Sequence, residues 1–135
     1  MSAPDKVERE DVQVMFMRAS DDTSVAIQRA WAELEVTVGL KGRKFFGAFY
    51  DEIREYRVCA QLKEGDDPEA LGLEAGTLPG GRYLRARLQG EPPAVYDQIR
   101  PTLEELVKQA VVDPSRPTIE FYRSRDVIDL LLPVT

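Results

Sequence analysis

The residue best suited to chemistry in this sequence is Glu120, a carboxylate within the β-forming run Ile119-Glu120-Phe121-Tyr122. Alternate side chains of a strand point to the same face, so Glu120 shares a face with Thr118 and Tyr122. A carboxylate among tyrosines can pair with a cation, helped by the faces of the aromatic rings. Burial can instead raise its pKa, so that it acts as a general acid or base. If this face is solvated, Glu120 is an ordinary polar residue on a half-exposed strand.

Composition excludes several other kinds of site. The 135 residues include no histidine and one cysteine, Cys59, which excludes Ser-His-Asp triads, Cys-His pairs, histidine metal sites and an intrachain disulfide. We therefore expect no metal and no cofactor. The net charge of -6 argues against a nucleic-acid partner and slightly favours cationic ligands. The sequence has no long apolar run and begins with a polar segment, so we expect a cytoplasmic protein with no membrane partner.

The elements that must position Glu120 follow from residue patterns. The apolar spacing predicts an α+β fold with two main helices and antiparallel sheets. One helix is expected directly after the cap candidates at Ser20–Ser24. A second helix is expected at 95–110, where Pro101 predicts a kink or a late start. The expected strands are 12–17, 45–50, 56–62, 83–88, 118–123 and 127–134.

The same order of strand, helix, strand and strand occurs twice. A constant shift of 72 residues superimposes the apolar positions of the two halves, which predicts two pseudo-twofold-related β-α-β-β units with a central pocket between them. This shift aligns Glu120 with Ala48, and it predicts that Ala48 and Tyr50 share the face of Glu120. The first copy then departs from the second at the position of the carboxylate.

These patterns predict a single domain at 12–134. Its first repeat is expected at 12–62, a connecting loop at 63–81 and the second repeat at 82–134. The segment 1–11 is expected to be disordered or extended.

Four short motifs resemble one known family. They are PTIEFY at 117–122, LPGGRY at 78–83, AFYD at 48–51 and LLLPV at 130–134. In their order and spacing they resemble the GyrI-like small-molecule-binding domains, which are related to the effector-binding domains of multidrug-sensing MerR-type and AraC-type regulators. The resemblance covers about residues 12 to 134.

This resemblance implies a duplicated strand-helix-strand-strand fold with a central pocket. It implies that Glu120 contacts cationic lipophilic compounds and that Tyr122 faces the pocket. The chain has no room for a helix-turn-helix before residue 12, so we do not expect it to regulate transcription by binding DNA directly. Other members of the GyrI-like family imply two alternative functions for this chain. One is a hydrolase that opens cyclopropane-bearing alkylating compounds, and the other is a gyrase-interacting protective protein.

Three functions therefore remain open. A stand-alone binding protein would hold hydrophobic, including cationic, compounds between Glu120 and the aromatic walls Tyr50, Tyr122 and Trp31, with Ala48 leaving space. A hydrolase would use Glu120 to position or deprotonate water, while Tyr50 or Tyr122 donates a hydrogen bond to the developing oxyanion. An interaction protein would bind a larger partner such as gyrase through its surface rather than through its pocket. The apolar helix face of Trp31 favours a core anchor, with the pocket wall as the alternative.

Overall fold

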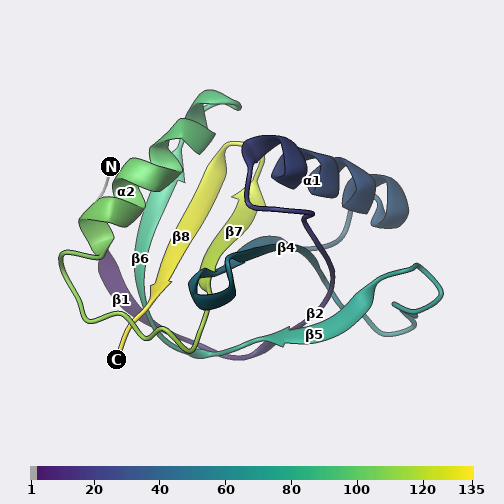
Figure 1. Ribbon diagram of the computed structural model, residues 1–135, viewed down its shortest axis with the longest axis horizontal. Helices are drawn as coiled ribbons and strands as arrows, with labels where there is room; N and C mark the ends of the chain where they lie inside the picture. The colour runs from purple at the N-terminus through teal and green to yellow at the C-terminus, as the bar shows by residue number, and fades with distance from the viewer. Residues whose placement is uncertain (1–2) are drawn as a thin grey trace.

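The computed structural model describes residues 3–135 as one antiparallel sheet and two helices (Figure 1). The strands are β1 (Asp5–Arg9), β2 (Val12–Arg18), β3 (Phe45–Tyr50), β4 (Glu55–Gln61), β5 (Glu74–Leu78), β6 (Gly81–Gln89), β7 (Thr118–Ser124) and β8 (Val127–Pro133). The helices are α1 (Ser24–Val38) and α2 (Ile99–Leu106), with short 3-10 turns η1 (Asp51–Ile53) and η2 (Ala94–Gln98). The strand order is β1-β6-β8-β7-β3-β4-β2-β5, which confirms the predicted α+β class.

Both helices begin and end at residues whose chemistry explains the boundary. The hydroxyl of Thr23 accepts a hydrogen bond from the amide of Ala26 and caps α1. Gly39, with a φ of 77°, ends it. α2 begins at Ile99, which places Pro101 in the first turn, where a missing N–H leaves no intrahelical bond unmade. The predicted late start is therefore confirmed.

The two helices cover one face of the sheet but leave its centre between them. α1 lies against β2 and β4, and α2 lies against β6 and β8 (Figure 1). Met15, Val58 and Ala60 pack with Leu34 under α1, and a second cluster packs with Leu106 under α2. The central strands β3 and β7 therefore present their helix-facing side chains between α1 and α2.

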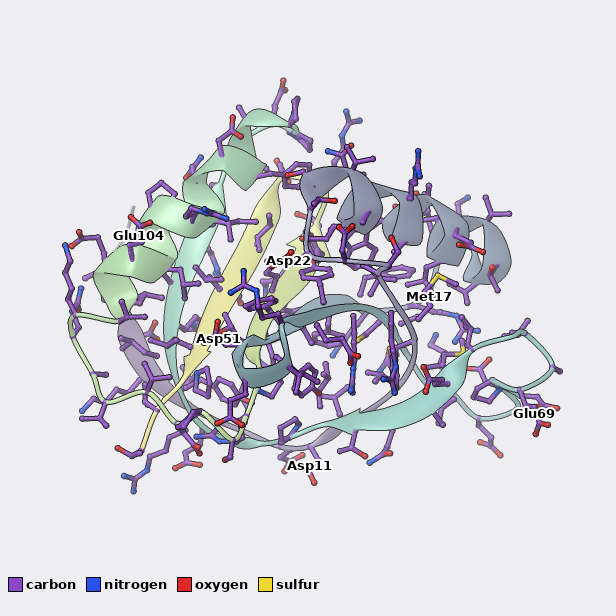
Figure 2. The ribbon with its side chains drawn as sticks, in the orientation of Figure 1. Asp11, Met17, Asp22, Asp51, Glu69 and Glu104 are labelled. Atoms are coloured by element: carbon purple, nitrogen blue, oxygen red, sulfur yellow. The ribbon has the colours of Figure 1, made fainter. Side chains whose placement is uncertain are left out.

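The opposite face of the sheet is buried by the curl of the sheet. Its core contains ten buried residues, namely Val14, Phe16, Phe46, Ala48, Cys59, Leu78, Tyr83, Ile119, Phe121 and Leu131. The sheet turns a corner where β1 leads into β2 and β5 leads into β6. At this corner, at the lower edge of Figure 2, Asp11 Oδ1 accepts a hydrogen bond of 2.6 Å from the amide of Gly80. A Cβ on Gly80 would lie 2.4 Å from the carbonyl oxygen of Arg9, so this crossing requires glycine.

Each copy of the repeat begins with one more strand than the sequence pattern predicts. β1 precedes β2 as β5 precedes β6, and each added strand pairs with the second strand of the other copy. The predicted N-terminal segment 1–11 therefore contributes a strand to the sheet, and the predicted connecting loop 63–81 contains another. Met1 and Ser2 lie outside the described residues.

The constant shift of 72 residues is wrong for part of the repeat. It holds in the last strand of each copy, where Val58 and Leu130 are both buried on the helix-facing side. Val58 pairs with Gly47 on β3, and Leu130 pairs with Glu120 on β7. Gly47 and Glu120 are therefore equivalent, and the shift between β3 and β7 is 73. In β2 and β6 the shift is 69, as it is between β1 and β5. β2 carries apolar side chains on both faces, so its sequence pattern fits more than one register.

Within residues 3–135, no helix is long and apolar enough to span a membrane.

Candidate functional site

Glu120 lies at the centre of the helix-facing side of the sheet. Its neighbours across the ladder are Gly47 on β3 and Leu130 on β8. Gly47 has no side chain and Leu130 is completely buried, so the carboxylate is flanked by apolar surface. Because β3 and β7 lie between the two helices, the Glu120 side chain points into the region that separates α1 from α2.

Two tyrosine hydroxyls donate hydrogen bonds to the same oxygen of Glu120. Tyr122, two residues further along β7, donates to Oε1 at 2.6 Å. Tyr56 on β4 donates to Oε1 at 2.7 Å, although β3 lies between its strand and β7. We call Glu120, Tyr56 and Tyr122 the tyrosine clamp. It binds one carboxylate oxygen and draws its members from both copies of the repeat.

Gly47 makes the longer of these two bonds possible. The Tyr56 side chain crosses β3 at Gly47 on its way to Glu120. A Cβ at position 47 would lie 2.0 Å from the Tyr56 hydroxyl and 2.8 Å from Glu120 Oε1. Real Cβ atoms essentially never approach another atom this closely, so any side chain at position 47 must displace the clamp.

Among the described residues, the second oxygen of Glu120 has no hydrogen-bond partner. Among residues 3–135, the hydrogen bonds to this carboxylate all end on Oε1. No buried side-chain oxygen in that part of the chain lacks a partner, which means that Oε2 is not closed off from the surroundings. Glu120 is thus held by one oxygen and offers the other to whatever enters the site.

The electrostatic environment of the clamp is set by burial. Burial raises the pKa of Glu120 above its ordinary value, while the hydroxyls of Tyr122 and Tyr56 oppose this shift by stabilising the carboxylate. Burial, followed by the charge of Glu120, raises the pKa of both tyrosines well above the usual range, so both remain protonated donors.

No cation of the described chain neutralises Glu120. Its carboxylate takes part in none of the ion pairs among residues 3–135. The same part of the chain holds no group of three or more acidic or cysteine side chains placed to bind a metal ion.

Aromatic side chains form one wall of the site. The ring of Trp31 on α1 meets Tyr122 edge-on, with ring centroids 5.1 Å apart, and meets Phe45 at 6.4 Å. Tyr122 also packs against the buried cluster of Leu88, Val95 and Ile128. Trp31, Tyr122 and Glu120 are all partly exposed. Trp31 therefore packs on the core under α1 and also borders the clamp.

The predicted positions of Ala48 and Tyr50 are wrong. The ladder pairs Ala48 with Ile119, not with Glu120, and successive residues of a strand point to opposite faces. Ala48 and Tyr50 therefore belong to the core on the other side of the sheet. There the Arg57 guanidinium lies 4.2 Å from the centroid of the Tyr50 ring. Neither residue lies on the face that carries Glu120.

Sequence reasoning missed Tyr56 and Gly47. Tyr56 lies on an apolar face with Val58 and Ala60, and this pattern gives no sign that its hydroxyl reaches a carboxylate two strands away. The signal for Gly47 was present, since an isolated glycine inside a strand marks a close approach of other atoms.

Cys59 and Tyr83 also lie on the opposite face from Glu120. Cys59 is completely buried, and burial raises the pKa of its thiol to about 12. Tyr83 is completely buried as well, and its hydroxyl donates to the carbonyl of Pro79 at 2.6 Å. Both are core residues.

A cavity of about 250 Å³ opens beside the clamp. Its lining consists of Arg43, Lys44, Phe121, Tyr122 and Arg123, so Tyr122 borders it while Glu120 does not.

No family model matches the chain, and no curated protein matches it. Solved structures match nearly all of it. SAV2435 bound to tetraphenylphosphonium has a TM-score of 0.67 and 13% identity, over 99% of this chain and 94% of that chain. The EcmrR C-terminal domain has a TM-score of 0.68 and 14% identity, over 98% and 97%. The chain has a GyrI-like fold. A hydrolase from Listeria innocua shares this GyrI-like fold at a TM-score of 0.61 and 12% identity, over 98% and 91%.

Proposed function

We propose that this chain is a small-molecule-binding protein that holds hydrophobic cations at Glu120. The observation that carries this proposal is the tyrosine clamp. Two hydroxyls keep the Glu120 carboxylate in place by Oε1, and no lysine or arginine of residues 3–135 pairs with it. A carboxylate that is held in an apolar setting without a cation leaves a favourable interaction unmade, and a cationic ligand supplies it.

The surroundings of the carboxylate favour a ligand that is apolar as well as charged. Trp31 and Tyr122 are partly exposed beside Glu120, and aromatic rings attract cations and bury flat apolar surface. The overall charge of -6 adds a weak long-range attraction. SAV2435, which has the same fold, was solved with the hydrophobic cation tetraphenylphosphonium, and this supports the same class of ligand here.

The test is a titration with tetraphenylphosphonium followed by the fluorescence of Trp31, which is the single tryptophan of the chain. Because Trp31 contacts Tyr122, a ligand that binds beside the clamp should change its emission. We expect Glu120→Gln to weaken binding about tenfold or more, since it removes a charged partner.

The matched control for this titration is Glu104→Gln. It removes the same charge from an exposed position on α2 (Figure 2). Equal affinity of Glu120→Gln and Glu104→Gln for the probe would refute the proposal.

A second candidate is a hydrolase that opens cyclopropane-bearing alkylating compounds. The observation in its favour is the free Oε2 of Glu120, which could orient a water molecule toward an electrophilic carbon. Tyr50 lies on the other face of the sheet, and the hydroxyl of Tyr122 already donates to Oε1, so neither is free to stabilise an oxyanion in this arrangement. Incubating the protein with such a compound and following the ring-opened product by mass spectrometry tests this candidate. Product formation that Glu120→Gln abolishes, with binding retained, would favour the enzyme.

A further inference from the structure

The two oxygens of Glu120 differ in what they can still accept. A carboxylate has about four lone-pair sites, two on each oxygen. On Oε1, the hydroxyls of Tyr56 and Tyr122 take both of them. Oε2 accepts no hydrogen bond from residues 3–135, so all the remaining capacity of the carboxylate lies on that atom.

The cross-strand neighbours of Glu120 offer no side-chain donor that could replace water at Oε2. The ladder neighbours of Glu120 are Gly47 and Leu130, which have no side-chain donors. A ligand that covers Oε2 therefore removes its contact with water. If the ligand has no hydrogen to donate, the oxygen keeps the Coulomb attraction to the cation but loses its hydrogen bonds to water, which costs free energy. If the ligand carries an N–H, the oxygen gains a charge-assisted hydrogen bond instead.

We infer that the Glu120 site selects cations that carry an N–H, such as protonated amines and amidines, over fully substituted onium ions of similar size. This inference rests on the proposed binding function and narrows its ligand class. Both kinds of cation gain the same Coulomb attraction to the carboxylate. They differ in the hydrogen bond to Oε2, because the tyrosines have already taken the other oxygen.

The inference can be tested with two probes that differ by one methyl group. The first is 4-biphenylmethyl-dimethylammonium, a tertiary amine used at a pH at which it is protonated. The second is the corresponding trimethylammonium ion, in which a methyl replaces the N–H. The extra methyl favours the quaternary ion by hydrophobicity. A preference for the tertiary ion must therefore come from its N–H.

Isothermal titration calorimetry of the two probes gives the ratio of their dissociation constants. We expect the tertiary ion to bind about tenfold more tightly to the wild-type protein. In Glu120→Gln we expect both probes to weaken and the ratio to fall below about threefold, because a neutral amide forms a weaker bond with a cation. Glu104→Gln, on the exposed face of α2, should keep the wild-type ratio (Figure 2).

The outcomes separate this inference from the function on which it rests. Equal or tighter binding of the quaternary ion, with both probes sensitive to Glu120→Gln, would overturn the donor selectivity and leave cation binding intact. Binding of neither probe would overturn both. A tenfold preference that persists in Glu120→Gln would show that the selecting group is not Glu120, and the inference would be wrong.

Discussion

Replacing Gly47 with alanine should break the tyrosine clamp although Glu120, Tyr56 and Tyr122 themselves are unchanged. The new Cβ would lie 2.0 Å from the Tyr56 hydroxyl and 2.8 Å from its ring carbon Cζ, whereas ordinary contacts begin at about 3.4 Å. The Tyr56 ring must therefore move by more than an ångström. The 2.7 Å bond to Glu120 cannot survive such a movement.

The size of the effect follows from the lost bond. A hydrogen bond to a charged group contributes about 1.5–3 kcal/mol, so the ionised form of Glu120 should lose about that much stability. Burial already raises the pKa of Glu120, and losing one of the two opposing hydroxyls should raise it further. As pH falls, Glu120 should therefore become neutral, and cation binding should be lost, at a higher pH than in the wild type. Overpacking at Gly47 should lower the free energy of unfolding by about 1–3 kcal/mol as well.

The assay is the affinity for tetraphenylphosphonium as a function of pH, measured with the Trp31 signal. Tyr56→Phe removes the same bond without a clash and should shift the pH midpoint as Gly47→Ala does. In the double variant the two shifts should not add, because one bond cannot be lost twice. Gly76→Ala is the control for general destabilisation, since its Cβ would meet the Phe16 ring at 2.8 Å on the other face. A wild-type pH midpoint in Gly47→Ala, with Tyr56→Phe shifted, would refute the role of the glycine.

Three further predictions concern buried ionisable groups. A raised pKa means that the folded state favours protonated Glu120, so its contribution to stability is lost as pH rises through that pKa. Glu120→Gln should therefore melt above the wild type at pH 8 and match it in acid, and a lower melting temperature at pH 8 would contradict this. Asp129 is completely buried and is paired with Arg87 and Arg123. Asp129→Asn should lower the free energy of unfolding by about 2 kcal/mol in denaturant titrations and leave cation affinity unchanged. The Cys59 thiol, with its pKa raised to about 12 by burial, should react with iodoacetamide only as fast as the protein unfolds.

Much of the fold could be predicted because local patterns and the global arrangement agree. The helix caps, the apolar helix faces and the hairpins all follow from nearest neighbours in the chain. β1 and β5 could not be found in this way. Each is short and mostly exposed, as edge strands tend to be, and each pairs with the other copy of the repeat. Nothing in their own sequence specifies that pairing.

The site shows how a single residue of register decides which side chains meet. Glu120 and Tyr122 were correctly placed on one face because they are two residues apart on the same strand. Ala48 was assigned to that face by a repeat shift of 72, whereas the ladder shows a shift of 73 in this strand. Because side chains alternate with a period of two, an error of one residue moves a position to the opposite side of the sheet.

The corrected register explains why the site holds one carboxylate rather than two. Gly47 and Glu120 are equivalent positions of the two copies, and they are also direct neighbours in the β3–β7 ladder. Two glutamates there would be like charges a few ångströms apart in an apolar setting, and they would repel. Glycine in the first copy removes that second charge. It also leaves the space through which Tyr56 reaches Glu120. The duplicated scaffold is therefore asymmetric where its two copies meet, since one copy supplies the carboxylate and Tyr122 while the other supplies the opening and Tyr56.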